Sequence, residues 1–185
     1  MTTRVSDYTL EQLRRAVTDR HPMPAGVAVA AVSSSLALGL LAKVLTVTGR
    51  RKSAAGDLAR LESLAAAAAA SSRRLLQLAE DDVAAFEAYL TANRAPSSTE
   101  QEREKRRGAV DSALARTIEV PLAAAQETAV GLELCTDALP LVPRELAADV
   151  GVTTALLEGA RRGFLLCADS NSEQRKAAAA LRSQT

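Results

Sequence analysis

Residues 20–52 decide the fold, and they read RHPMPAGVAVAAVSSSLALGLLAKVLTVTGRRK. The two prolines break any preceding helix, and the apolar run from Gly26 to Thr48 then predicts one long helix that stops at Gly49. Three consecutive cations follow, Arg50, Arg51 and Lys52. A helix N-terminus offers unpaired N–H groups and a positive dipole, and the cations add full charge. Both ends of this helix therefore suit an anionic or electron-rich ligand.

The composition of the 185 residues indicates a single all-α domain spanning residues 1–185. Alanine and leucine dominate, aromatic residues make up 2% and Trp is absent, which is typical of a helical bundle. Lys and Arg number 23 against 22 for Asp and Glu, so the formal net charge is +1. With no strong positive field and few aromatic rings for base stacking, no nucleic-acid partner is expected.

The cysteine and histidine content gives no metal site. Cys135 and Cys167 are interpreted as small apolar core residues, and two thiols with one histidine exclude the usual zinc ligand sets. The N-terminus lacks a secretory pattern, so we expect a cytoplasmic protein. Residues 27–47 are long and apolar enough to span a bilayer, but small Ala and Ser residues and Lys43 weaken membrane insertion. A buried central helix, or an oligomer interface, is favoured over a membrane span.

Hydrophobic periodicity and breakers predict about six helices. A first helix over residues 8–19, with Thr9 as N-cap, precedes the long Ala-rich helix. A third helix is expected over residues 56–93. A fourth should begin at Ser98 or Thr99 and reach residue 139, with an end or a kink at Pro121. The last two are expected over residues 144–168 and 172–182. The sequence therefore predicts a helical bundle around a buried Ala-rich helix.

The acidic run Glu80-Asp81-Asp82 contains the first candidate catalytic group. Asp82 shares a helix face with Phe86 and Tyr89, which attaches its carboxylate to the apolar side of the helix. A carboxylate at the edge of an apolar site acquires a raised pKa and suits general acid/base catalysis. The alternative interpretation is an ordinary acid on the helix surface.

Three further positions are weaker candidates. Asp149 precedes Gly151, whose missing side chain permits close approach of a backbone or a ligand; close helix packing and a solvent-facing Asp149 are the alternatives. The pair at residues 161–162 is interpreted as solvated cations. His21, the sole histidine, lies in the proline turn, where it is either a proton carrier at the helix mouth or an exposed turn residue.

In order along the chain, these segments resemble the cyclodeaminase/cyclohydrolase family, which includes the cyclodeaminase domain of formiminotransferase-cyclodeaminase and stand-alone methenyltetrahydrofolate cyclohydrolases. The matching stretches are Pro22-Met23-Pro24-Ala25-Gly26, Gly49-Arg50-Arg51-Lys52, Asp82-Val83-Ala84-Ala85-Phe86, Val120-Pro121-Leu122-Ala123 and Asp149-Val150-Gly151-Val152. The resemblance implies an all-α fold, a homodimer or higher oligomer, and a folate site near the glycine-containing turn.

The chain also departs from the family pattern. The family's turn reads Thr-Pro-Gly-Gly-Gly-Ser, whereas residues 23–28 lack two of the glycines and the serine. The family's Asn-Leu-Thr before the basic run is replaced by Leu45-Thr46-Val47, and an asparagine of the late helix corresponds to Cys167, with Asn171 as a second one retained. These replacements make the expected lining less polar.

The resulting hypothesis is an enzyme that adds to, or eliminates from, a C=N bond. Its catalytic residues are expected to be Asp82 as the general acid/base and Asp149 as an electrostatic partner. The residues expected to contact a small-molecule substrate with an anionic group are Gly26, Arg50, Arg51, Lys52, Phe86 and His21. A tetrahydrofolate derivative is a candidate substrate, with no other cofactor expected. The alternatives are a relative that acts on a non-folate cyclic imine or amine, and a non-catalytic binding or scaffold protein.

Overall fold

The computed structural model describes residues 4–51 and 54–182, and within them the regular structure is helical without a strand. The prediction of an all-α fold is therefore confirmed. The helices are η1 (Val5–Asp7), α1 (Leu10–Thr18), α2 (Gly26–Gly49), α3 (Leu58–Asn93), α4 (Glu100–Ala138), η3 (Arg144–Leu146) and α5 (Ala147–Arg182), where η marks a 3-10 turn.

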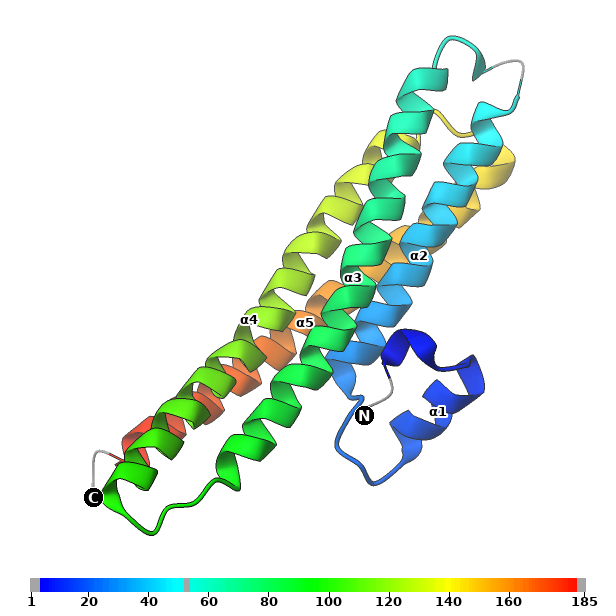
Figure 1. Cartoon of the computed structure of the whole chain (residues 1–185). Coiled ribbons are helices and arrows are strands. Elements are labelled where there is room, and N and C mark those ends of the chain that lie inside the picture. Colours follow the sequence, from blue (N-terminus) through cyan, green and yellow to red (C-terminus); the bar gives the residue numbers. More distant parts are fainter. Residues whose placement is uncertain (1–3, 52–53, 183–185) are drawn as a thin grey trace.

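The four long helices form an up-and-down bundle (Figure 1). Each of α2, α3, α4 and α5 runs antiparallel to the next and packs against it, and α5 closes the ring by packing on α2. Leucines and Phe164 fill the centre, and alanines let the helices approach one another closely. Short connections between long helices produce this topology.

Polar contacts fix the register of neighbouring helices. The Ser72 hydroxyl of α3 donates to the Ser35 carbonyl of α2 over 2.8 Å. The Thr153 hydroxyl of α5 donates to the Ala37 carbonyl of α2 over 3.1 Å. Arg74 of α3 makes an ion pair with the carboxylate of Glu127 of α4 at 2.7 Å. These contacts therefore hold α3 and α5 in register with α2, and α4 in register with α3.

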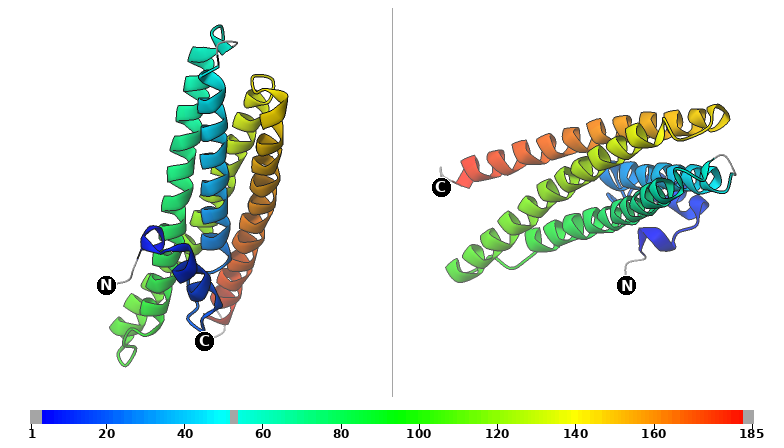
Figure 2. Two further views of the ribbon diagram at one scale, coloured as in Figure 1. Left: turned by 90° about the vertical axis from the view of Figure 1, so that its right-hand side faces the viewer. Right: turned by 90° about the horizontal axis from the view of Figure 1, so that it is seen from above.

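Helix starts follow the capping signals of the sequence. Thr9 and Thr99 each accept from the backbone N–H three residues later, while Gln12 and Glu102 return the bond to the cap backbone. Both predicted N-caps are confirmed. Figure 2 shows α1 against the outside of the bundle beside the start of α2, where Leu13 packs on the core and Leu10 is exposed.

One predicted boundary is absent, and five α-helices replace the expected six in the described residues. α4 continues through Pro121, where an end or a kink was expected, whereas α5 runs without interruption past residues 169–171, where the sequence suggested that boundary. That polar cluster contains neither Gly nor Pro, and Asn171 is held by a contact to α4 instead of ending the helix. Tertiary contacts therefore override the local signal.

The Ala-rich helix α2 is only partly enclosed. Its buried side contacts α3, α4 and α5, but Val29, Leu36 and Val47 are exposed in a strip along its outer side. By length and mean hydropathy, α2 is the one described helix that could cross a bilayer. Half of its most apolar window is buried inside the bundle. The expected buried central helix is therefore present, and it leaves this outer strip exposed.

Candidate active site

The three consecutive acids of α3 lie in different surroundings because successive residues of a helix face different directions. The Glu80 carboxylate accepts from the backbone N–H groups of Val5 and Ser6, both over 2.8 Å, and holds η1 against the bundle. Asp81 lies 3.6 Å from the Arg116 guanidinium of α4. Asp82 alone faces the proline turn and the start of α2, where its side chain is buried.

A pocket of about 310 Å³ lies where the proline turn, α2, α3 and α5 meet. Its walls are mainly apolar, with one carboxylate, one amide and one hydroxyl among them. The lining residues are Pro22, Met23, Ala25, Gly26, Val27, Asp82, Phe86, Leu166, Cys167, Ser170 and Asn171. Three residues singled out from the sequence, Gly26, Asp82 and Phe86, are therefore brought together.

Burial sets the chemistry of Asp82. With 7% of the residue exposed, loss of solvation raises the pKa of its carboxyl group to about 6, and a hydrogen bond from the Ala28 backbone N–H opposes that shift. No arginine or lysine lines the pocket among the described residues. Asp82 is thus a carboxyl group that changes charge near neutral pH beside a partly apolar cavity.

The same contact makes Asp82 a cap for α2. Ala25, the N-cap residue of α2, has no side-chain cap, so the α2 N–H groups depend on other partners. Asp82 serves Ala28, while the N–H groups of Gly26 and Val27 have no acceptor among the described residues. Gly26 and Val27 both line the pocket at the positive end of a 24-residue helix, which suits a hydrogen-bond acceptor or a partial negative charge on a ligand.

Gly26 and Cys167 form the narrow side of the pocket. A Cβ atom added at Gly26 would lie 3.6 Å from the Cys167 Sγ, which is ordinary contact, so the backbone approaches the thiol without strain. Burial, together with the nearby Asp82 charge, raises the pKa of the Cys167 thiol. The thiol therefore remains protonated at neutral pH and acts as a weakly polar wall.

Asn171 is oriented by a carbonyl that Pro121 leaves free. Pro121 has no N–H, so the Thr117 carbonyl one turn earlier loses its helical partner. The Asn171 side-chain amide donates to that carbonyl over 2.8 Å. With its Nδ2 engaged on α4, Asn171 has its Oδ1 left as an acceptor at the pocket. The Pro121 motif thus acts on the site through Asn171.

Of two other candidate residues, Phe86 lines the pocket and His21 directly precedes the lining residue Pro22. The Phe86 ring is half-buried, with its centroid 6.0 Å from that of Tyr89. His21 is exposed beside the cis Met23–Pro24 bond, and its Nδ1 lies 2.8 Å from the Met23 carbonyl oxygen. His21 therefore stabilises the proline turn, and Pro22, Met23 and Ala25 of that turn supply lining residues.

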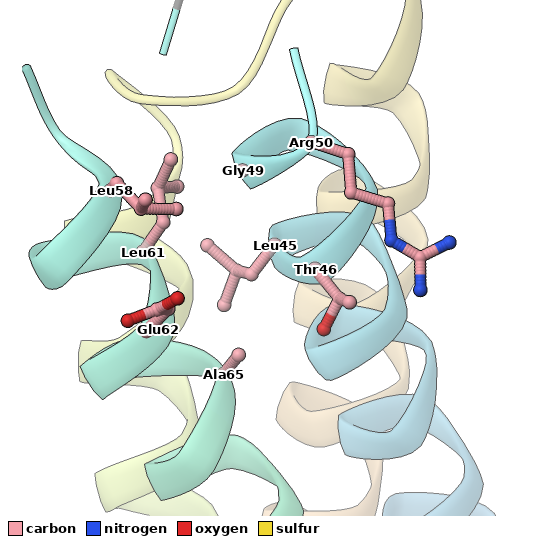
Figure 3. A pocket seen from close by; sticks show the side chains of 8 residues that line it. All are labelled: Leu45, Thr46, Gly49, Arg50, Leu58, Leu61, Glu62 and Ala65. Atoms are coloured by element: carbon pink, nitrogen blue, oxygen red, sulfur yellow. The ribbon is translucent and has the colours of Figure 1, made fainter. Parts of the chain in front are cut away.

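The basic residues lie at the opposite end of α2. Arg50 borders a different hollow, of about 410 Å³, between α2 and α3, and its guanidinium extends away from α3 (Figure 3). Arg51 makes an ion pair with Glu145 of η3 at 2.7 Å. Lys52 lies outside the described residues. A 24-residue helix spans about 36 Å, so within one chain Arg50 and Arg51 do not contact a small ligand that touches Asp82.

Asp149 also lies far from Asp82 within the chain. It belongs to the first turn of α5, where a carboxylate stabilises the helix N-terminus, and it is half-buried. Gly151 is exposed, with nothing within 4 Å of an added Cβ, so its expected close packing is absent within the chain. The sequence candidates therefore form two groups at opposite ends of the bundle.

A family profile described as formiminotransferase-cyclodeaminase matches residues 9–184. This chain belongs to the formiminotransferase-cyclodeaminase family. The match covers the pocket, both groups of candidate residues and all four long helices.

Curated relatives of this formiminotransferase-cyclodeaminase family member carry two names. A formimidoyltransferase-cyclodeaminase from Sus scrofa is 34% identical over 62% of this chain and 21% of its own length. A methenyltetrahydrofolate cyclohydrolase from Methylorubrum extorquens is 28% identical over 62% of this chain and 55% of its own length. The matches thus span about a fifth and about half of these relatives.

A solved structure supports the fold of this family member. The crystal structure of formiminotetrahydrofolate cyclodeaminase from Thermotoga maritima superposes with a TM-score of 0.81 at 22% identity. The superposition covers 92% of this chain and 81% of the other chain. At that identity the likeness establishes the shared helical architecture.

Leu166, Cys167, Ser170 and Asn171 contribute the α5 wall of the pocket; the resemblance pointed to Cys167 and Asn171, whereas Leu166 and Ser170 were not expected. Their spacing on one helix face was readable from the sequence, because residues three and four apart are neighbours on a helix. What the sequence lacked was the packing of that face against the start of α2, which only the closed bundle provides.

Proposed function

We propose that this chain is a cyclodeaminase/cyclohydrolase-type enzyme that acts on the C=N bond of a folate-type substrate, with Asp82 as the general acid/base. One observation carries the proposal: a buried carboxyl group with a pKa of about 6 lies between unpaired helix N–H groups and an aromatic wall. Family membership and the named activities of the relatives support the substrate class.

The proposed chemistry needs one proton shuttle. A nucleophile, either water or an amine of the substrate, adds to the electrophilic carbon of an amidinium group and gives its proton to the Asp82 carboxylate. The C–N bond then breaks, and Asp82 returns the proton to the departing nitrogen. A base with a pKa near 6 is well matched to accept and return a proton at neutral pH. Water as nucleophile makes the enzyme a hydrolase, and loss of ammonia makes it a lyase.

The pocket also suits the charge of such a substrate. An amidinium cation beside the Asp82 carboxylate compensates a buried charge that has no cationic partner in the lining. The Phe86 ring offers a face for a flat cationic group, and Gly26 lets the substrate approach the α2 backbone. His21 is proposed as a contact at the rim.

The first experiment is a titration with 5,10-methenyltetrahydrofolate, followed by its absorbance decay in the presence of the chain. Saturable binding with accelerated decay is expected, and Asp82→Asn should lower the rate at least about a hundredfold while binding persists. As a base, Asp82 gives a kcat/KM that rises with pH around 6 and levels off above it. An unchanged rate in Asp82→Asn removes Asp82 from the mechanism.

A second candidate is turnover of a non-folate cyclic imine or amine. The observation that favours it is the lining itself, in which Val27, Leu166 and Cys167 present apolar or weakly polar surface. Two results together would select this candidate. The folate should not bind at high concentration, and a small cyclic iminium compound should raise the melting temperature of the chain.

The non-catalytic alternative rests on the capping role of Asp82, because a carboxylate that only caps α2 needs no substrate. Solvent exposure of both candidate aspartates would favour that alternative, and Asp82 is buried. We also propose a homodimer, which the resemblance implies and which the exposed strip of α2 supports.

A further inference from the structure

The chain before α2 lies on the outside of the four-helix bundle and returns to it at the pocket, as Figure 1 and Figure 2 show. We call residues 4–25, which contain η1, α1 and the proline turn, the N-terminal arm. α1 packs on the bundle through the half-buried Leu13, and none of its residues is buried. Its ion pairs, from Glu11 to Arg14 and Arg15, lie within the helix. The arm is therefore held to the bundle chiefly at its two ends.

The first end of the arm is η1, which is docked against α3. Val5 is 5% exposed and belongs to the central apolar cluster. The two carboxylate oxygens of Glu80 accept one backbone N–H each, Oε2 from Val5 and Oε1 from Ser6, both over 2.8 Å. A carboxylate that receives two N–H donors at the start of a helical turn makes a strong and directional contact. One apolar side chain and one carboxylate therefore fix η1.

The second end of the arm is the proline turn, which forms one wall of the pocket. Pro22, Met23 and Ala25 line the cavity, and Met23 is 7% exposed. Asp82 lines the same cavity and follows Glu80 by two residues in α3. Two residues correspond to about 3 Å along a helix axis, so both ends of the arm meet the bundle at the level of one turn of α3.

Docking of η1 restricts the wall at the other end of the arm. Residues 8–21 connect η1 to the proline turn, so the arm is a closed loop while η1 is docked. If η1 leaves its site, the loop becomes a free tail, and the chain before Pro22 gains conformational freedom. The wall then depends on contacts within the turn, such as the 2.8 Å contact from His21 Nδ1 to the Met23 carbonyl oxygen. A docked η1 therefore favours a formed pocket wall.

We propose that the N-terminal arm is a strap that completes the candidate active site, and that Val5 and Glu80 form the latch that keeps it closed. Glu80 is thus a positioning residue, which acts on the pocket through the arm. A substrate that contacts Met23 binds the closed form, so its affinity falls with the fraction of closed molecules. By linkage, bound substrate holds the latch closed. The part of this inference that concerns substrate rests on the proposed function, whereas the latch does not.

The chain offers a matched control for each half of the latch. Asp81 is the neighbour of Glu80, but it lies 3.6 Å from Arg116 of α4. Asp81→Ala therefore deletes a contact between α3 and α4 and leaves both hydrogen bonds of η1 in place. Leu10 of the arm is 81% exposed, so Leu10→Ala removes apolar side chain from the arm without emptying a buried site. These two variants are the controls for Glu80→Ala and Val5→Ala.

The native thiols report opening of the strap without any substrate. Cys167 is half-buried in the pocket wall, whereas Cys135 is buried beside a different hollow, between α4 and the start of α5. The measurement is the rate of N-ethylmaleimide labelling at each thiol, followed by mass spectrometry of peptides. Labelling of Cys167 should be at least about threefold faster in Glu80→Ala and Val5→Ala than in wild type, with Cys135 unchanged.

The labelling experiment has two contradicting outcomes. Both control variants should label like wild type at both thiols. An unchanged rate at Cys167 in Glu80→Ala and Val5→Ala would overturn the strap. An equal acceleration at Cys135 would show general loosening of the bundle and would also overturn it.

Kinetics test whether Glu80 positions the pocket for substrate. With 5,10-methenyltetrahydrofolate, Glu80→Ala and Val5→Ala should raise KM by about three- to tenfold. The kcat should stay within about twofold of wild type, because saturating substrate closes the strap. A lower kcat with an unchanged KM would overturn the positioning role. If no folate turnover exists at all, the labelling result still decides whether the arm is latched, so the two failures are distinguishable.

Discussion

At the scale of single residues, the acidic run of α3 shows how one sequence feature gives three functions. Glu80 anchors η1, Asp81 meets Arg116, and Asp82 enters the pocket. Helical periodicity predicted that the three acidic side chains point in different directions and that Asp82 lies on the apolar face of the helix. Its burial and its bond to Ala28 depend on the start of α2, which is 54 residues earlier in the chain.

Asp82 should make the folded protein less stable as the pH rises from about 4 to 6. Its folded pKa of about 6 lies above the ordinary value of 3.8, so the folded state binds the proton more tightly. The favourable contribution is therefore complete below pH 4 and is lost by pH 6, a difference of roughly 3 kcal/mol.

The measurement is urea unfolding of wild type and Asp82→Asn across this pH range. The variant should match or exceed wild type in free energy of unfolding at pH 7, and the free energy of unfolding of the variant minus that of wild type should fall by roughly 3 kcal/mol toward pH 4. Taking the difference removes the contribution of the other carboxyl groups. A variant that is much less stable at pH 7 would mean that capping of α2 outweighs the burial of charge.

At the scale of elements, α4 carries a proline that would end an isolated helix. Pro121 is buried in the bundle, and the Thr117 carbonyl that it frees accepts a hydrogen bond from Asn171 of α5. The sequence predicted an end or a kink at this position, and the helix continues through it. The sequence could not choose between the two outcomes, because the compensating donor comes from another helix.

Pro121 and Asn171 should therefore be coupled. Asn171→Ala leaves the Thr117 carbonyl without a partner and should cost about 1–2 kcal/mol of stability. In a Pro121→Ala background the restored N–H satisfies that carbonyl, so the same change should cost much less. A double-mutant cycle by urea unfolding measures the coupling, and additive effects would show that the Asn171 bond is energetically unimportant.

At the scale of the whole molecule, close packing across the bundle centre depends on Gly131 of α4. An added Cβ there would lie 3.0 Å from Leu157 of α5 and 3.1 Å from Leu38 of α2. Gly108, at the other end of α4, has open space around it. Because both glycines lie in α4, alanine at either position gains helix propensity, and only alanine at Gly131 also crowds its neighbours.

Gly131→Ala should destabilise the bundle by about 1–3 kcal/mol through overpacking, despite the better helix propensity of alanine. Gly108→Ala should be neutral or stabilising by up to about 1 kcal/mol. Thermal unfolding of both variants at one protein concentration provides the comparison. A stabilised Gly131→Ala would mean that the Leu38 and Leu157 side chains move aside at little cost.

The sequence by itself determined the helical class, the start of α2 at the proline turn, the two Thr caps and the apolar side on which Asp82 lies. These features depend on local rules: backbone geometry, capping and the period of 3.6 residues. Tertiary structure alone decided that Asp82 and Gly26 share a pocket with α5, and that Asp149 and the basic residues lie at the other end. The physical reason is that the proximity of distant residues is fixed by the order and register of packed helices, which no local pattern specifies.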